Sequence, residues 1–113
     1  MGRGEVAKQL HILDLGLAKF YRQNNGKHIA KKEGKPLTGT AKYASLFTHR
    51  GTEQSRRDDI EGIGYVVMYL LRGNLPWQHY RIINKKDKYA QMQQMKEETS
   101  LKELCNGYPL EFV

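Results

Sequence analysis

Residues Ser55–Trp77 read SRRDDIEGIGYVVMYLLRGNLPW, and this stretch decides the fold that the sequence predicts. Its large apolar residues are spread around the whole circumference of a helix with 3.6 residues per turn, whereas a surface helix would keep one polar face. They are Ile60, Ile63, Val66, Val67, Met68, Tyr69, Leu70 and Leu71. We therefore predict a central helix that is buried on most of its sides.

Both ends of this helix are marked in the sequence. Ser55 can cap the start, Asp58 follows three residues later as in a capping box, and Asp59 adds negative charge where the helix dipole favours it. Gly73 follows the last apolar turn and Pro76 lies beyond it, which predicts the end. The apolar run of about 12 residues is too short to span a bilayer, which needs roughly 20.

Size and charge limit the classes of protein. The chain has 113 residues, enough for one small domain, and its 19 Lys and Arg against 12 Asp and Glu give a net charge of +7. This charge indicates an anionic partner such as nucleic acid, a membrane surface or a phosphorylated protein, although a solvated basic surface would look the same. The single cysteine, Cys105, excludes an internal disulfide and fits a reducing compartment. Because neither end has the apolar core of a signal peptide, we expect a cytoplasmic or nuclear location.

A candidate metal-binding turn lies near the start of the chain. Leu10–Leu13 predicts a short buried strand, and Asp14-Leu15-Gly16 ends it. A carboxylate at the end of a strand, followed by a glycine, could bind a metal ion. An Asp shortly before a Gly also occurs in ordinary turns, and that alternative stays open.

Two segments between this turn and the central helix have distinct compositions. Lys19–Pro36 is basic, polar and poor in large apolar residues, so we predict a long loop, and long loops in compact domains are usually functional. The following LTGTAKYAS, Leu37–Ser45, has small residues and hydroxyls that predict a tightly turned backbone held by side-chain hydrogen bonds.

Two further helices are predicted after Trp77. Lys85–Glu98 carries Tyr89, Met92 and Met95 on one face, which indicates an amphipathic helix. Its first turn is basic, with lysines at 85, 86 and 88, where cations oppose the helix dipole. These lysines indicate either an anion-binding role or a solvated face. A short last helix is predicted to follow Ser100, which forms a capping-box pattern with a glutamate three residues later.

Three stretches, in this order and spacing, resemble one family. They are Asp14-Leu15-Gly16, LTGTAKYAS at 37–45 and EQSRRDDIEGIGYVVMYLLRGNLPWQ at 53–78, and together they closely resemble the casein kinase I family of serine/threonine protein kinases. Residues 44–47, Ala-Ser-Leu-Phe, stand where most kinases have Ala-Pro-Glu, a substitution that looks like a trait of this family. The resemblance covers essentially the whole chain, as far as GYPLEF at 107–112.

The resemblance implies a fold class: mainly α, a partial protein kinase-like C-terminal lobe over residues 1–113, with a central buried helix, a long activation-type loop and at most a short strand. A kinase also needs a Gly-rich loop over the phosphates and a catalytic loop that supplies the base and an asparagine, and neither pattern is found in this sequence. Met1-Gly2-Arg3-Gly4 resembles a stretch that follows the catalytic loop in the family. We therefore expect a piece of a kinase domain, from the metal-binding turn to the penultimate part of the large lobe.

The resemblance also implies an activity and its cofactors. The complete enzyme would transfer the γ-phosphoryl group of ATP to Ser or Thr of acidic or pre-phosphorylated proteins, with Asp14 holding Mg²⁺ on the ATP phosphates. No catalytic residue is assigned, because the catalytic-loop aspartate is not in the sequence. Lys19–Pro36 matches the activation loop and Thr38–Ser45 the substrate-docking segment. Asp59 matches a buried structural aspartate that tethers the catalytic loop, and here its partner is missing.

The family reads a phosphate or acidic group on its substrates with a basic pocket. The residues at the matching positions are Lys42, Gln78, His79 and Lys88. The family usually has arginine where Lys42 stands and glycine where His79 stands. Lysine keeps the charge but loses the bidentate fork, so we expect weaker recognition of the oxyanion.

Three functional classes follow. The leading one is a casein kinase I-like kinase polypeptide that is truncated and inactive by itself. The alternative is a non-catalytic module that binds acidic or phosphorylated peptides. A nucleic-acid binder is indicated only by charge and is not expected, because the sequence lacks the interleaved aromatic residues of a base-stacking surface. A membrane partner is not expected either.

Overall fold

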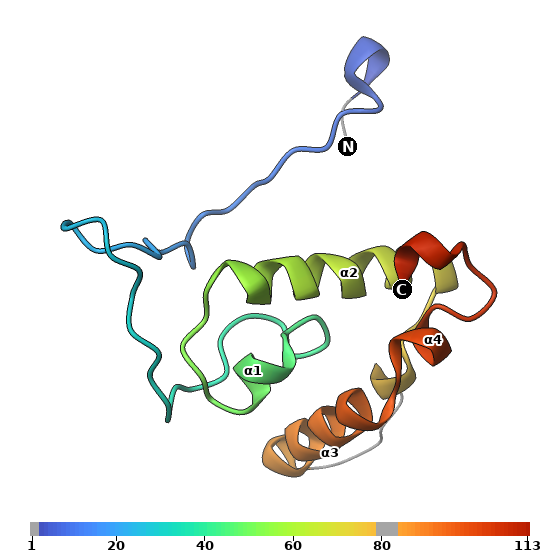
Figure 1. Ribbon diagram of the computed structural model, residues 1–113. Helices are drawn as coiled ribbons and strands as arrows, with labels where there is room; N and C mark the ends of the chain where they lie inside the picture. The colour runs from blue at the N-terminus through green and yellow to red at the C-terminus, as the bar shows by residue number, and fades with distance from the viewer. Residues whose placement is uncertain (1–2, 79–83) are drawn as a thin grey trace.

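The computed structural model describes residues 3–78 and 84–113, and in these ranges the chain is mainly helical (Figure 1). The elements, in chain order, are η1 Gly4–Val6, α1 Leu46–His49, α2 Arg56–Arg72, η2 Pro76–Gln78, α3 Lys85–Glu98, α4 Leu101–Leu104 and η3 Leu110–Phe112. Within the described ranges no strand forms, and the only β-type pairing is one antiparallel bridge between Arg22 and His28. The predicted helical character is therefore confirmed.

The predicted strand over Leu10–Leu13 is wrong. These residues form part of an extended arm that runs away from the helices, and Leu10, Ile12 and Leu13 are 81%, 90% and 82% exposed (Figure 1). A strand is stable only when a neighbouring segment takes up its backbone hydrogen bonds. In the described part of the chain no segment lies beside the arm to do so.

The predicted ends of the central helix are confirmed by α2. The Asp58 carboxylate accepts a hydrogen bond of 2.7 Å from the Ser55 N–H, which is one half of the expected capping box. At the other end Gly73 adopts a φ of 78° and donates its N–H to the Tyr69 carbonyl at 2.8 Å. Because a side chain is strained in this left-handed conformation, glycine is the residue that ends the helix.

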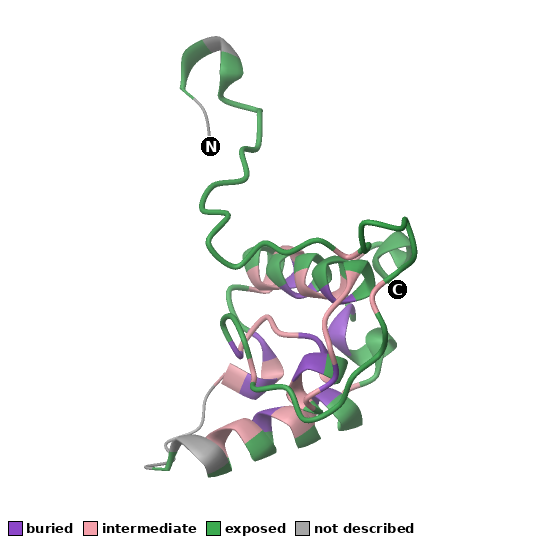
Figure 2. Ribbon diagram, turned by 90° about the vertical axis from the view of Figure 1, so that its left-hand side faces the viewer, coloured by how far each residue is buried: buried purple, intermediate pink, exposed green. Residues whose placement is uncertain are grey.

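The predicted burial of α2 on most sides is wrong. Only Asp58, Tyr65 and Met68 of this helix are buried, and the buried residues gather between α2 and the other helices (Figure 2). The exposed large apolar residues of α2 are Ile60, Ile63, Val66, Leu70 and Leu71. Their side of α2 is apolar in sequence, but the described residues supply no second layer of structure to cover it.

The core lies between α2, η2, α3 and α4. It consists of Ala41, Tyr65, Met68, Leu75, Trp77, Met92, Leu104 and Cys105. The Trp77 and Tyr65 rings meet edge to face, with their centroids 4.9 Å apart. The side chain of Arg72 and the hydroxyl of Tyr108 tie the C-terminal part to α2, by donating to the carbonyls of Leu104 and Leu71.

The remaining helical predictions are confirmed. α3 has the bounds that the sequence predicts, and Met92 on its apolar face is buried. The Ser100 hydroxyl accepts from the Glu103 N–H at 3.2 Å at the start of α4. Residues 19–36 form a long loop without a helix or strand. Among the described residues, none of the helices combines the length and the apolar character needed to cross a membrane.

Candidate functional site

The segment Thr38–Ser45 is a tight turn whose backbone is fixed by the rest of the fold. The Thr40 carbonyl accepts from the N–H groups of Tyr43 and Ala44 at 2.9 and 3.1 Å, which closes the turn. The Trp77 indole N–H of η2 then donates to the Lys42 carbonyl at 2.8 Å. The tight turn that the small residues predict is thus confirmed, and a buried aromatic residue holds it in place.

The end of this segment is anchored on α2. The Ser45 hydroxyl donates to Asp58 Oδ1 at 2.5 Å and accepts from the Thr48 N–H at 3.0 Å, so that Ser45 caps α1. The Leu46 N–H donates to Glu61 at 2.9 Å, and the same carboxylate oxygen accepts from the Tyr65 hydroxyl at 2.7 Å. Two carboxylates of α2 therefore position the segment that precedes it.

Lys96 anchors the same turn from α3. Its side chain is almost fully buried, and its ammonium group donates to the carbonyls of Ala41, at 3.0 Å, and Ala44. It also lies 4.8 Å from the centroid of the Tyr65 ring and 5.1 Å from that of Trp77. Because burial removes water from the charged form, the pKa of Lys96 falls to about 7, although Glu61 opposes the shift.

His49 lies beside this lysine. Its Nε2 is 3.3 Å from the Lys96 amine and 3.1 Å from the Ala41 carbonyl. Burial, and next the charge of Lys96, lower the pKa of His49. Sequence reasoning missed the role of Lys96. The signal was present, since Lys96 follows Met92 by four residues and therefore shares its buried face.

Both ends of the long loop are held by one carboxylate. Glu53, which precedes α2, forms ion pairs with Lys19 and with Lys35, the latter at 3.0 Å. The Glu53 N–H also bonds to the Lys32 carbonyl at 2.8 Å. The hydrogen bonds from Lys19 and Lys35 lower the pKa of Glu53 to about 2. This pairing was not predicted, because nothing in the local pattern around Glu53 indicates which lysines it meets.

The residues predicted to bind an anion are brought together only in part. Lys42 places its ammonium group 3.7 Å from the centroid of the Tyr69 ring and 4.5 Å from that of Tyr43. Gln78 lies next to Trp77, which bonds to Lys42, but its side-chain oxygen accepts from the Leu75 N–H at 3.2 Å.

Lys88 is half-buried on α3. Within residues 3–78 and 84–113, no hydrogen bond or ion pair joins it to Lys42 or Gln78. His79, the remaining residue predicted to bind the anion, lies outside the described residues.

Asp14 forms a local turn. It is exposed, has a φ of 63°, and its Oδ1 accepts from the Gly16 N–H at 3.0 Å. Mg²⁺ needs several oxygen ligands in octahedral geometry. No group of three or more His, Cys, Asp or Glu side chains that could hold a metal ion occurs in the described part of the chain. This geometry is that of an ordinary turn, the alternative that the sequence left open for Asp14-Leu15-Gly16.

Asp59 is exposed, whereas its neighbour Asp58 is the buried carboxylate of α2. Asp59 lies at a small cavity of about 160 Å³ together with Leu17, Tyr21 and Arg56. The partner that would bury Asp59 in the predicted fold is not in this sequence.

A larger cavity of about 720 Å³ lies between α2 and the C-terminal part of the chain. Its apolar lining includes Ile60, Val67, Met68, Leu101, Leu104 and Phe112. Three glutamates, Glu61, Glu97 and Glu111, also line it, in a protein with a net charge of +7. We call this cavity the apolar groove. Sequence reasoning did not predict it, because its lining comes from segments far apart in the chain.

No protein-family model matches this sequence. The structure itself shows a mainly helical protein in which side chains of η2 and α3 anchor the turn at Thr38–Ser45.

Proposed function

We propose that this chain is part of the large lobe of a casein kinase I-like serine/threonine kinase. The complete enzyme would transfer the γ-phosphoryl group of ATP to Ser or Thr of acidic or pre-phosphorylated proteins in the cytoplasm or nucleus. One observation carries this proposal. The segment Thr38–Ser45, which resembles a substrate-docking segment, is held by buried side chains: Asp58 of α2 accepts from the Ser45 hydroxyl, and Trp77 of η2 and Lys96 of α3 donate to backbone carbonyls.

The anchoring supports docking on physical grounds. A peptide binds more tightly to a surface whose backbone is already ordered, because less conformational entropy is lost on binding. Trp77 and Lys96 fix carbonyls on the inner side of the turn, and Lys42 keeps its ammonium group over the Tyr69 ring. The turn is therefore a preorganised element that carries a positive charge.

Catalysis is assigned to the complete enzyme and not to residues 1–113. In the complete enzyme Asp14 would hold Mg²⁺, which stabilises charge on the transferred phosphoryl group. The base and the Gly-rich loop are not among these residues. Asp14 lies in an exposed turn, in which its Oδ1 accepts from the Gly16 N–H.

A second candidate function is a non-catalytic module that binds acidic or phosphorylated peptides. The net charge of +7 and the partly exposed Lys42 beside η2 favour it. In both proposals Lys42, Gln78, His79 and Lys88 form the anion site. A phosphate there would accept charge-assisted hydrogen bonds, which are stronger than neutral ones.

The test is a titration, followed by fluorescence anisotropy, of a peptide phosphorylated three residues before a serine and of its unphosphorylated twin. We expect the phosphorylated peptide to bind more tightly, and Lys42→Ala with Lys88→Ala to remove most of the difference. Each lysine should contribute about 1 kcal/mol, the upper range for exposed charge pairs. Equal binding of the two peptides by the unmodified chain would contradict the proposal.

A matched control separates the site from overall charge. Lys27→Ala with Lys102→Ala removes the same two charges at exposed positions outside the predicted site. This variant should keep the preference for the phosphorylated peptide. Far-UV circular dichroism of all variants checks that their helical content is unchanged.

A further inference from the structure

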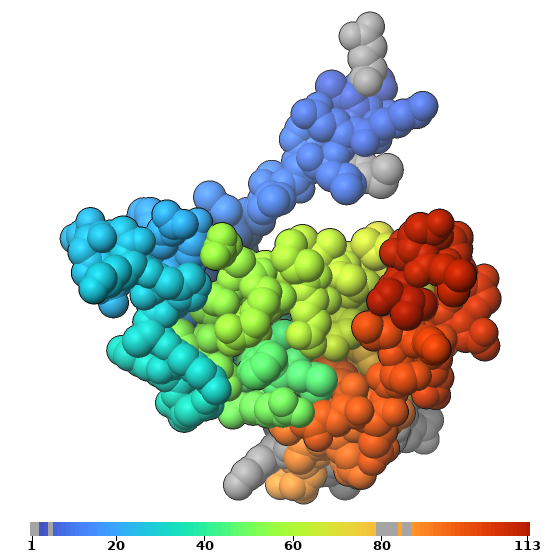
Figure 3. Space-filling model, viewed as in Figure 1, coloured from blue at the N-terminus to red at the C-terminus, as the bar shows by residue number. Residues whose placement is uncertain are grey.

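Two apolar surfaces of this chain lack a partner. The first is the arm, residues 6–20, in which Ile12 and Phe20 are 90% and 92% exposed. Its outer part stands clear of the helical body (Figure 3), whereas Leu17 and Lys19 at its base lie beside residues 54–59. Its exposed large apolar residues are Val6, Leu10, Ile12, Leu13, Leu15, Leu17 and Phe20. The second is the apolar groove together with the uncovered side of α2. Contiguous apolar surface on this scale usually marks an interaction site.

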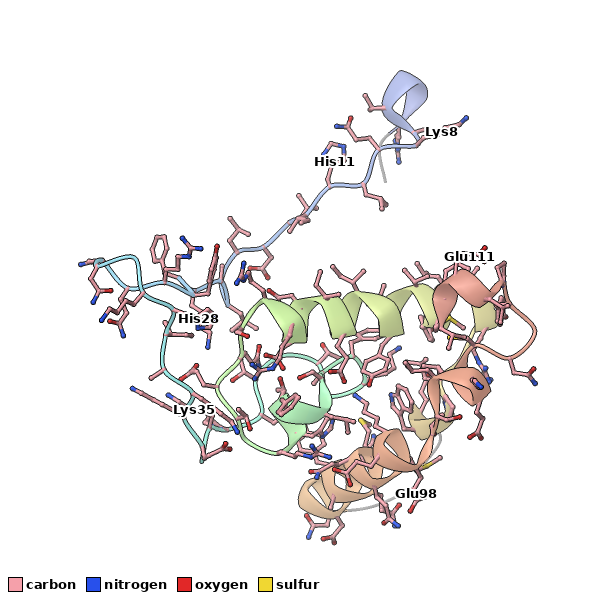
Figure 4. The ribbon with its side chains drawn as sticks, viewed as in Figure 1. Lys8, His11, His28, Lys35, Glu98 and Glu111 are labelled. Atoms are coloured by element: carbon pink, nitrogen blue, oxygen red, sulfur yellow. The ribbon has the colours of Figure 1, made fainter. Side chains whose placement is uncertain are left out.

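The two surfaces are complementary in apolar character and in charge. The arm is extended over residues 9–13, so Leu10 and Ile12 can face one side, and the turns that follow leave Leu13, Leu15 and Leu17 exposed. The groove offers an apolar floor, and its charged lining residues are Glu61, Lys96, Glu97 and Glu111. Glu61 already accepts from Tyr65 and Glu97 pairs with Arg50, which leaves Glu111 for a charged partner. The arm carries Lys8 and His11, and Glu111 lies on the C-terminal turn at the groove (Figure 4). Within the described residues Glu111 forms no ion pair.

The arm of one molecule does not lie in its own groove. Two local turns direct it away from α2: Gly16 N–H bonds to the Asp14 side chain at 3.0 Å, and Ala18 N–H bonds to the Leu15 carbonyl at 2.9 Å. The ion pair between Lys19 and Glu53 fixes the base of the arm beside the start of α2 (Figure 1). The arm is thus presented outward, where a second molecule can receive it.

We propose that two copies of this chain form a symmetric dimer in which the arm of each lies in the apolar groove of the other. Because each copy supplies both an arm and a groove, one twofold arrangement covers both sets of surfaces. If about three apolar side chains of each arm are buried, at roughly 100 Å² each and with a similar area on the groove, the two arms together bury roughly 1,200 Å², the lower end of the range for a stable interface. This inference does not depend on the kinase resemblance.

The first test is the mass of the full chain in solution, measured by sedimentation equilibrium over a range of micromolar concentrations. We expect a dimer. The variant Leu13→Asp with Leu15→Asp should weaken the dimer at least tenfold, because it places two charges among the apolar side chains of the groove. The control Gln23→Asp with Asn24→Asp adds the same charges on the exposed loop and should leave the dimer unchanged. A chain that is monomeric throughout overturns the proposal.

The second test locates the arm, using Cys105→Ser as background so that the introduced thiols are the only ones. A tagged chain with Leu15→Cys is mixed with an untagged chain with Val113→Cys, since Val113 is exposed and lines the groove. Mild oxidation should yield a tagged–untagged disulfide, whereas Lys27→Cys in place of Leu15→Cys should not. A dimer without this disulfide overturns the arm as its occupant. A third chain carries both Leu15→Cys and Val113→Cys. If its disulfide forms within a single monomer, the arm folds onto its own groove, and the proposal that two copies exchange arms is overturned.

Discussion

Lys96 shows how a single charged residue can organise the interior of a small helical protein. Its ammonium group lies in the core and donates to the Ala41 and Ala44 carbonyls of the turn at Thr38–Ser45. Those carbonyls face away from water, and an unpaired buried carbonyl is costly. The lysine satisfies them, and the cost is the desolvation of its own charge, which the lowered pKa reflects.

The first prediction concerns stability against pH. The pKa of Lys96 is about 7 in the folded chain, against its ordinary value of 10.5 in the unfolded chain. Between these values the unfolded state binds more protons, so the free energy of unfolding should rise with pH, by at most about 1.4 kcal/mol per pH unit. Urea unfolding from pH 7.5 to 9.5 measures this rise, a range in which His49 is already neutral.

The control for this prediction uses two methionine variants. Lys96→Met should lack the rise, and Lys102→Met, at an exposed lysine of α4, should keep it. If the free energy of unfolding rose with pH by the same amount in the unmodified chain and in Lys96→Met, the rise could not be assigned to Lys96. Measurements stop at pH 9.5 because burial and the hydrogen bond to Glu61 raise the pKa of Tyr65, and tyrosine ionisation in the unfolded state acts in the opposite direction above that pH.

The second prediction separates two neighbouring aspartates. Asp58 is buried and accepts hydrogen bonds from Ser45 and from the Ser55 N–H, whereas Asp59 is exposed. Asp58→Asn replaces an acceptor by an amide group facing two donors and should lower the free energy of unfolding by about 1–3 kcal/mol. Asp59→Asn should change it by less than about 0.5 kcal/mol. Chemical denaturation of both variants is the measurement, and equal losses would show that Asp59 also has a buried partner.

Among the elements, the loop over residues 19–36 depends on contacts outside itself. It lacks a helix, a strand and a core of its own, yet its two ends meet at Glu53. A further tie is the hydrogen bond of 2.8 Å from the Lys35 N–H to the Gly51 carbonyl. The loop is therefore closed at its base and free at its tip, which is the arrangement expected of a loop that receives a ligand while attached to a rigid body.

The third prediction concerns this closure. Glu53→Gln removes the negative charge shared by Lys19 and Lys35 and should loosen the base of the loop. Limited trypsin digestion should then cut after Lys27 and Lys31 several times faster than in the unmodified chain. Glu97→Gln, which removes a carboxylate paired with Arg50 elsewhere on the surface, should leave these cleavage rates unchanged.

Acid provides an independent test of the same closure. Because the pKa of Glu53 is lowered from 4.5 to about 2, its contribution is fully present above pH 4.5 and is lost only as the pH falls toward 2. Hydrogen exchange of the Lys35 and Glu53 amides should therefore stay slow at pH 3. Rapid exchange of both amides at pH 3 would contradict the ion-pair arrangement.

At the scale of the whole molecule, α2 is covered on one side only. The helix carries apolar residues all round, but η2, α3 and α4 pack only against the side that bears Tyr65 and Met68, where the buried residues lie (Figure 2). The other side and the arm leave large apolar surfaces in contact with water. We propose that, in a dimer, the arm of one copy covers the apolar groove beside α2 of the other copy.

The fourth prediction concerns activity. Residues 1–113 should transfer no phosphoryl group from ATP to casein, because phosphoryl transfer depends on positioning by a base and a phosphate-covering loop that these residues do not include. A radiolabelled-ATP assay with the purified chain is the measurement. Transfer that is abolished by Asp14→Asn would contradict this expectation, and Asp87→Asn serves as the control for the loss of one exposed carboxylate.

The sequence by itself determined where the helices begin and end. Ser55 with Asp58, Gly73, and Ser100 with Glu103 act within a few residues of one another, so their effect on the backbone can be predicted without knowledge of the fold. The polar composition of residues 19–36 also determined the long loop, because these residues provide nothing that could form a core.

Only the tertiary structure decided which surfaces are buried and which charges meet. Apolar residues all round α2 predicted burial, but burial needs a neighbouring layer, and the described chain supplies one on a single side. The hydrogen bonds of Lys96 to the carbonyls of Ala41 and Ala44, the pairing of Glu53 with both ends of its loop, and the groove each join segments that are far apart in the chain. Such contacts depend on how the chain is arranged in three dimensions, and local sequence patterns carry no information about that arrangement.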